Sequence, residues 1–147
     1  MSFDSTVLTP RQPVIKSQFT PANPTGTTST TGVMAGLAIL YTPSKSGILR
    51  ITCEIQLGNT TTADGGTAQI SEGTGTVPVN GAAKTGTQLG ASKTVTALTG
   101  ILNSPVTLNA LITGLIKGVQ IWIDLLLTAV TGGTTTNTSI VIIIEET

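Results

Sequence analysis

Short runs of alternating apolar and polar residues, separated by turn sequences, make up most of this chain of 147 residues. A period of two residues places successive side chains on opposite faces of a β-strand. The clearest run spans residues 48–57, where polar residues occupy every second position from Arg50 onward. Similar but less regular runs predict further strands at 33–41, 67–72, 93–98, 106–112, 119–130 and 139–145.

These runs indicate an all-β fold, because no segment shows the period of an amphipathic helix. Threonine and glycine are abundant; threonine favours strands, and glycine favours the turns between them. Seven or eight strands at this spacing predict an antiparallel jelly roll or β-sandwich. The pattern at 119–130 alone does not separate a strand from a buried helix, but Gly118 and Gly132 bound the run as they would bound a strand.

Composition divides the chain into an extended N-terminal arm, residues 1–32, and a β domain, residues 33–147. In isolation a segment with the composition of this arm should be disordered. Proline, which disfavours helix and favours extended backbone, punctuates it at Pro10, Pro13, Pro21 and Pro24. Two short apolar pieces are candidates for contacting a neighbouring subunit, namely Val7 with Leu8 and Val14 with Ile15.

Charge is low and balanced, with seven basic and seven acidic residues. A nucleic-acid-binding protein needs a basic face, so we expect no nucleic-acid partner. Zero net charge also weakens the repulsion between copies, which suits a protein that assembles. No apolar run reaches the roughly 18 residues of a membrane helix, and residues 1–4 do not begin a signal peptide, so we expect no membrane partner.

The residue inventory argues against catalysis. Histidine, the most frequent general base and metal ligand, is absent. The carboxylates are scattered, so we expect no enzyme activity, no catalytic residue, no cofactor and no metal site. The single cysteine, Cys53, lies on the apolar face of 48–57 and is expected to be a buried thiol. Glu145 and Glu146 are expected to keep the last strand soluble and to blunt its edge.

The last two predicted strands carry apolar residues on both faces. Such a strand requires cover on both sides, and a second subunit would supply it. The alternative is that loops or the arm cover the outer face within one chain. Asp124 would lie at the contact and would need a hydrogen-bond partner, such as a backbone group or a threonine hydroxyl. The predicted oligomer interface consists of Trp122, Asp124, Leu126, Val141 and Ile143.

Several glycine- and threonine-rich pieces recur along the chain, at 26–37, 42–47, 63–66, 73–83, 122–125 and 130–134. With these pieces the chain resembles a family of small bacteriophage virion proteins, and the similarity extends from Thr25 to Glu146. The resemblance implies a jelly-roll trimer, with an outline similar to tumour-necrosis-factor-like heads, on a capsid or a tail appendage. It implies no catalytic residues.

Two functions follow as hypotheses. In the first, the chain is a capsid decoration or cement protein, a homo-oligomer, with three copies as the favoured number, whose arms clamp neighbouring shell subunits such as the major capsid protein. In the second, it is a receptor-binding or structural module of a tail fibre or spike, and the loop at 73–90 is the recognition surface. In both we expect it to be made in the bacterial host cytoplasm and to reside in the virion.

Overall fold

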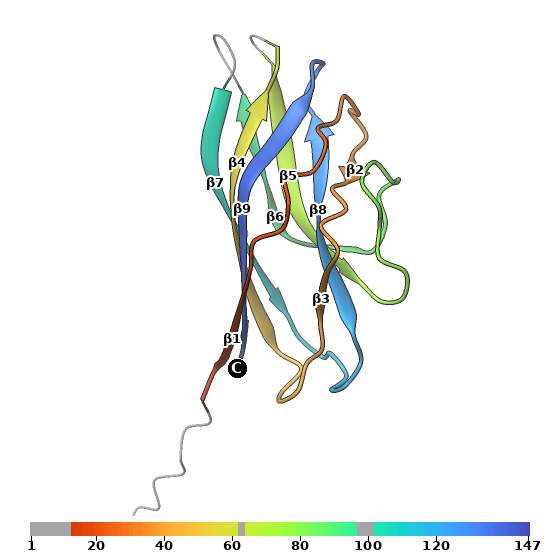
Figure 1. Cartoon of the computed structure of the whole chain (residues 1–147), viewed down its shortest axis with the longest axis vertical. Coiled ribbons are helices and arrows are strands. Elements are labelled where there is room, and N and C mark those ends of the chain that lie inside the picture. The colour runs from red at the N-terminus through yellow and green to blue at the C-terminus, as the bar shows by residue number, and fades with distance from the viewer. Residues whose placement is uncertain (1–12, 62–63, 97–101) are drawn as a thin grey trace, which may run out of the picture.

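The computed structural model describes residues 13–61, 64–96 and 102–147, and the regular elements of this part are all β-strands (Figure 1). The prediction of an all-β chain is therefore confirmed. The strands, in chain order, are β1 Ile15–Phe19, β2 Val33–Met34, β3 Ile39–Tyr41, β4 Leu49–Asn59, β5 Gly65–Gly73, β6 Thr87–Thr96, β7 Leu102–Ile112, β8 Ile121–Ala129 and β9 Thr135–Glu146.

The strands form two antiparallel sheets that pack face to face (Figure 1). The four-stranded sheet has the order β1-β9-β4-β7, and the five-stranded sheet has the order β2-β8-β5-β6 with β3 also paired to β8. From β6 to β9 the chain crosses from one sheet to the other at each connection, as in a jelly roll. The predicted antiparallel jelly-roll sandwich is confirmed.

Apolar side chains from both sheets fill the interior. The inward positions of β4 alternate with exposed polar ones, which is why a period of two residues predicted this strand correctly. Cys53 is fully buried, as expected. Burial raises the pKa of its thiol to about 12, and the nearby Glu54 carboxylate adds to the rise. The buried residues that β4 contributes are Leu49, Ile51, Cys53, Ile55 and Leu57.

Residues 33–41 do not form the single strand that their alternation predicts. They form β2 and β3 with an irregular segment between them. Gly36 and Ala38 have φ values of 71° and 53°, which lie in the left-handed region and interrupt a strand. A side chain at Gly36 would also meet the backbone nitrogen of Asn80 at 2.2 Å. The break depends on contacts with segments far away in the sequence, so local alternation does not reveal it.

Part of the predicted arm belongs to the sandwich. β1 pairs with β9, from Ile15 opposite Glu146 to Phe19 opposite Ile142. Further along, Thr27 forms a two-way backbone bridge with Thr135. Figure 1 shows this segment running beside β9 and then crossing to β2. The chain's own strands therefore hold residues 15–32.

One polar side chain sits in the interior at an energetic cost. Asn137 is fully buried, and neither its Nδ2 nor its Oδ1 has a hydrogen-bond partner in the part of the chain that the structure describes. Desolvating such a group without a hydrogen bond costs about 1–3 kcal/mol. We expect Asn137→Leu, which has a similar volume, to raise the free energy of unfolding by about 1–3 kcal/mol in urea denaturation.

Asn59 provides the matched control, because it is equally buried but satisfied. Its Nδ2 donates to the carbonyl oxygens of Gly65 at 3.0 Å and Gly132 at 3.1 Å. Asn59→Leu should therefore lower the free energy of unfolding by about 1–3 kcal/mol. If Asn137→Leu and Asn59→Leu change the free energy of unfolding in the same direction, hydrogen bonding of the buried amide does not explain the effect of either substitution.

Candidate functional site

Three of the predicted interface residues lie on β8, facing away from the main core. Trp122, Asp124 and Leu126 are 3%, 0% and 8% exposed in the single chain. Met34, with Val77 and Ala82 from the loop 74–86, packs over Trp122 and Leu126 and forms a second, smaller core. The prediction that these three residues face another subunit is wrong, because the chain covers them itself. The alternative, cover by a loop within one chain, describes the structure.

Trp122 anchors the loop 74–86 over β8. Its indole Nε1 donates a hydrogen bond to the carbonyl oxygen of Thr74 at 3.2 Å. A Cβ added at Gly73 or Gly86 would lie 2.4 or 2.3 Å from the indole ring, so both glycines make room for it. The segment that sequence alone assigned to an irregular loop at 73–90 is thus a fixed layer, and β6 begins within it at Thr87.

Asp124 organises the break between β2 and β3. Its carboxylate accepts hydrogen bonds from the amides of Gly36 at 2.9 Å, Leu37 at 3.0 Å and Leu125 at 2.8 Å. The expected need for a hydrogen-bond partner is therefore met by backbone groups of the same chain. Burial raises the pKa of Asp124, and the three amides oppose this rise without cancelling it.

Glu146 has a similar structural role at the other end of the sandwich. Its side chain is fully buried and accepts hydrogen bonds from the amides of Ser44 at 3.0 Å, Lys45 at 2.6 Å and Ser46 at 3.0 Å. Burial alone would raise the pKa of Glu146, but the amides outweigh it and lower the pKa to about 2. The expectation that Glu146 blunts an edge is wrong, because β9 lies between β1 and β4.

The low pKa of Glu146 predicts a pH-dependent contribution to stability. The folded pKa of about 2 lies below the ordinary 4.5, so the contribution is complete above 4.5 and fades as the pH falls towards 2. We expect Glu146→Gln to lower the free energy of unfolding by about 1.5–3 kcal/mol at neutral pH. Urea denaturation at several pH values, monitored by the fluorescence of Trp122, is the measurement. The difference in free energy of unfolding between wild type and Glu146→Gln should become smaller as the pH falls.

Glu145→Gln is the control for this experiment. Glu145 is only half-buried and pairs with Lys16 at 3.5 Å, so its loss should cost less than about 1 kcal/mol. A gap between wild type and Glu146→Gln that stays constant from neutral pH to pH 2 would contradict the role given to the Glu146 carboxylate.

The other two predicted interface residues lie on the opposite side of the molecule. Val141 and Ile143 are half-buried and point away from the core, on the solvent side of the four-stranded sheet. We call this side the outer sheet face. The residues of β1, β9, β4 and β7 that form it are Lys16, Gln18, Val141, Ile143, Glu145, Arg50, Thr52, Glu54, Gln56, Thr107, Asn109 and Leu111.

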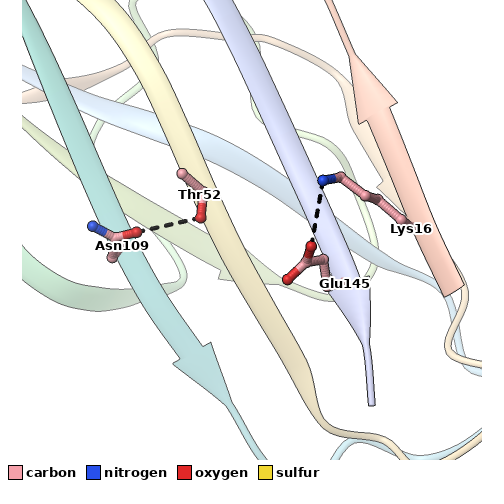
Figure 2. Close-up of polar contacts among 4 residues, drawn as sticks. All are labelled: Lys16, Thr52, Asn109 and Glu145. Carbon is pink, nitrogen blue, oxygen red and sulfur yellow. Dashed lines mark hydrogen bonds and ion pairs between the residues drawn. The ribbon is translucent and has the colours of Figure 1, made fainter. Parts of the chain in front are cut away.

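Polar contacts link neighbouring strands across this face. Figure 2 shows four of its side chains, one on each of β7, β4, β9 and β1. Lys16 Nζ pairs with Glu145 Oε1 at 3.5 Å, and Thr52 Oγ1 donates to Asn109 Oδ1 at 3.3 Å. Ile143 lies opposite Thr52 on β4 and opposite Gln18 on β1, and it is two residues from Glu145 along β9. The face thus has an apolar centre among polar residues.

A surface depression of about 490 Å³ lies at the β7 edge of the outer sheet face. It is formed where β6 approaches β7, since a Cβ at Gly90 would meet the carbonyl oxygen of Asn109 at 2.1 Å. Arg50 and the exposed Leu111 belong both to this depression and to the outer sheet face. The residues that line it are Arg50, Gly90, Asn109, Ala110 and Leu111.

The four residues predicted to contact a shell lie in different environments or outside the described residues. Val7 and Leu8 lie outside the described residues. Val14 is 55% exposed, just before β1. Ile15 belongs to β1, opposite Glu146, and is half-buried on the sandwich. Its own sheet covers part of this side chain, and its assignment as a shell contact stays a prediction.

Within 13–61, 64–96 and 102–147, no group of three or more Cys, Asp or Glu side chains is placed to hold a metal ion. In these same ranges no helix is long and apolar enough to cross a membrane.

Comparison with known proteins identifies the fold but no family. No family model matches the chain, and no curated protein matches it. The chain is similar to the crystal structure of the infectious bursal disease virus VP2 subviral particle, with a TM-score of 0.52, 13% identity and 91% of this chain covered. It spans 33% of that VP2 chain.

A second similar structure is the Eiger TNF from S. frugiperda, with a TM-score of 0.50 and 7% identity. The similarity covers 92% of this chain and 94% of that one. At these identities the likeness concerns the fold alone. It confirms the predicted tumour-necrosis-factor-like outline, while the resemblance to bacteriophage virion proteins stays a prediction.

Proposed function

We propose that this chain is a structural virion protein, not an enzyme, and that it assembles with copies of itself. The observation that supports a virion role is the fold, since the similarity to the VP2 chain of a viral subviral particle covers 91% of this chain. The outer sheet face adds a surface suited to self-association, because half-buried Val141 and Ile143 form an apolar centre among polar residues.

Within that role, capsid decoration or cementing is the form that the chain supports best. Val14 is exposed just before β1, next to Pro13, whose carbonyl oxygen accepts a hydrogen bond from Lys45 Nζ. This hydrogen bond attaches the chain to the sandwich at Pro13. The residues that precede Pro13 are the candidates for contacting a shell subunit such as the major capsid protein. Apolar area buried in this way contributes about 25 cal/mol per Å² before ordering costs.

The test is a comparison of virions that contain and lack the protein. Mass spectrometry of gradient-purified particles should detect the chain, and cryo-electron microscopy should place it on the shell. We expect particles without it to release their genome at a lower temperature. Absence of the chain from purified particles would refute the virion role, whereas unchanged heat resistance would refute cementing alone.

A specific observation supports the receptor-binding alternative. Val79 is 71% exposed at the tip of the loop 74–86, and Asn80 fixes that tip by donating to the carbonyl oxygen of Ala35 at 2.9 Å. An exposed apolar side chain on a fixed loop is a suitable contact for a receptor. Binding of purified protein to host cells, lost in Val79→Asp, would favour this function over decoration.

A further inference from the structure

The outer sheet face carries two charged side chains that form no ion pair with any described residue. The described residues contain one ion pair, between Lys16 and Glu145. Arg50 and Glu54 are both exposed on the same face of β4 and form no ion pair within the described part of the chain. They flank Thr52, two residues to either side.

Arg50 and Glu54 cannot pair with each other. Four residues along one strand separate their Cα atoms by about 13 Å. Glu54 lies opposite Val141 on β9 and Thr107 on β7, so its cross-strand neighbours offer no cation.

Arg50 lies opposite Leu111 on β7 and Glu145 on β9. The carboxylate of Glu145 is already paired with Lys16. The face therefore presents one positive and one negative group, each two residues from Thr52 and neither in an ion pair with another residue of the ranges 13–61, 64–96 and 102–147.

We propose that a second copy of the chain packs on this face through a twofold axis that runs across the strands at the level of Thr52. This inference rests on the proposed assembly role. Rotation about such an axis reverses the strand direction, so Arg50 of each copy faces Glu54 of the other. A twofold axis along the strands would instead place like charges together, which costs several kcal/mol. The charge pattern selects the first arrangement.

The same axis brings the apolar centre of the face onto itself. Ile143 lies beside Thr52, so the two copies of Ile143 meet near the axis and Val141 of each copy covers the partner's Glu145 stem. This produces an apolar centre with charged pairs on both sides, which matches the apolar core and polar rim of protein–protein interfaces. An isologous contact of this kind closes with two copies and satisfies both charges with one partner.

The experiment uses charge reversal and mixing, measured by sedimentation velocity on the full chain. Wild type should sediment as a dimer. Arg50→Glu and Glu54→Arg should each raise the dissociation constant by about 100-fold or more, because each places like charges together twice. The double variant, with both charges reversed, should dimerise as wild type does. Lys84→Glu, on an exposed loop away from this face, should leave the dimer unchanged.

The decisive sample is the equimolar mixture of the two single variants. One carries two negative groups at these positions and the other two positive ones, so they should form a heterodimer as tight as the wild-type dimer. A cyclic trimer could not restore full association in this mixture. A trimer built from the two variants always contains at least one contact between two copies of the same variant, which places like charges together. Restored association in the mixture therefore supports a twofold contact.

Three results would overturn the inference: a wild-type monomer at high concentration, a wild-type trimer such as the sequence-based prediction favours, or a mixture that stays dissociated. None of these bears on whether the chain is found in virions. Conversely, a charge-coded dimer that is absent from virions would refute the proposed function and leave the self-association in place.

Discussion

An Asp124→Ala variant is expected to lose about 3–5 kcal/mol of its free energy of unfolding. The carboxylate accepts hydrogen bonds from the amides of Gly36, Leu37 and Leu125, and its removal leaves these donors without an acceptor. The loss should appear as a lower midpoint in urea denaturation. The amide protons of Gly36 and Leu37 should also exchange faster with solvent, because the break between β2 and β3 depends on them.

Asp124→Asn separates the hydrogen bonds from the packing. Asparagine keeps the volume and one acceptor oxygen, but it turns its amide group towards backbone donors. We expect it to lose about half as much stability as alanine does. A loss below about 1 kcal/mol for Asp124→Ala would show that the three amides find other acceptors and that the carboxylate does not organise this segment.

Sequence periodicity predicted the strands whose two faces have different environments. From Leu49 to Leu57, β4 alternates between the core and the outer surface, so its apolar positions appear at every second residue. β8 was more ambiguous, because both of its faces are buried and the alternation disappears. Its bounding glycines nevertheless favoured a strand, which is correct.

The candidate interface was only partly predictable, because its cover comes from a segment without periodicity. The sequence shows that Trp122 and Leu126 need cover, but it does not show that residues 74–86 fold back over β8. That loop is held by contacts such as the one between Trp122 and Thr74, which join distant positions. Val141 and Ile143, by contrast, do point away from the core of the single chain.

The predictions for Glu146 and for β1 were wrong because both depend on hydrogen bonds to distant parts of the chain. Glu146 was expected at a solvated edge, but three amides of the turn after β3 make its burial favourable. β1 was assigned to an arm because prolines surround it, yet its backbone pairs with β9 at the other end of the chain. Hydrogen bonds between remote segments leave no periodic signal in the sequence.

Trp122→Ala is expected to lower the free energy of unfolding by about 3–5 kcal/mol, since it empties the centre of the second core. The loop 74–86 should also loosen, because the hydrogen bond from the indole to Thr74 disappears. Circular dichroism in urea gives the stability, since the substitution removes the single tryptophan. Limited proteolysis should cut the loop in the variant and spare it in wild type.

Gly73 tests whether the contact with the ring causes this effect. A Cβ at Gly73 would lie 2.4 Å from the indole Cζ2, and Gly73 lies in β5 without a positive φ, so the obstacle is the ring. Gly73→Ala should cost about 1–3 kcal/mol in wild type and clearly less in a Trp122→Leu background. If Gly73→Ala lowers the free energy of unfolding equally in both backgrounds, the glycine is needed for the backbone conformation and not for contact with the ring. That result would contradict the role of Trp122 as the anchor of this loop.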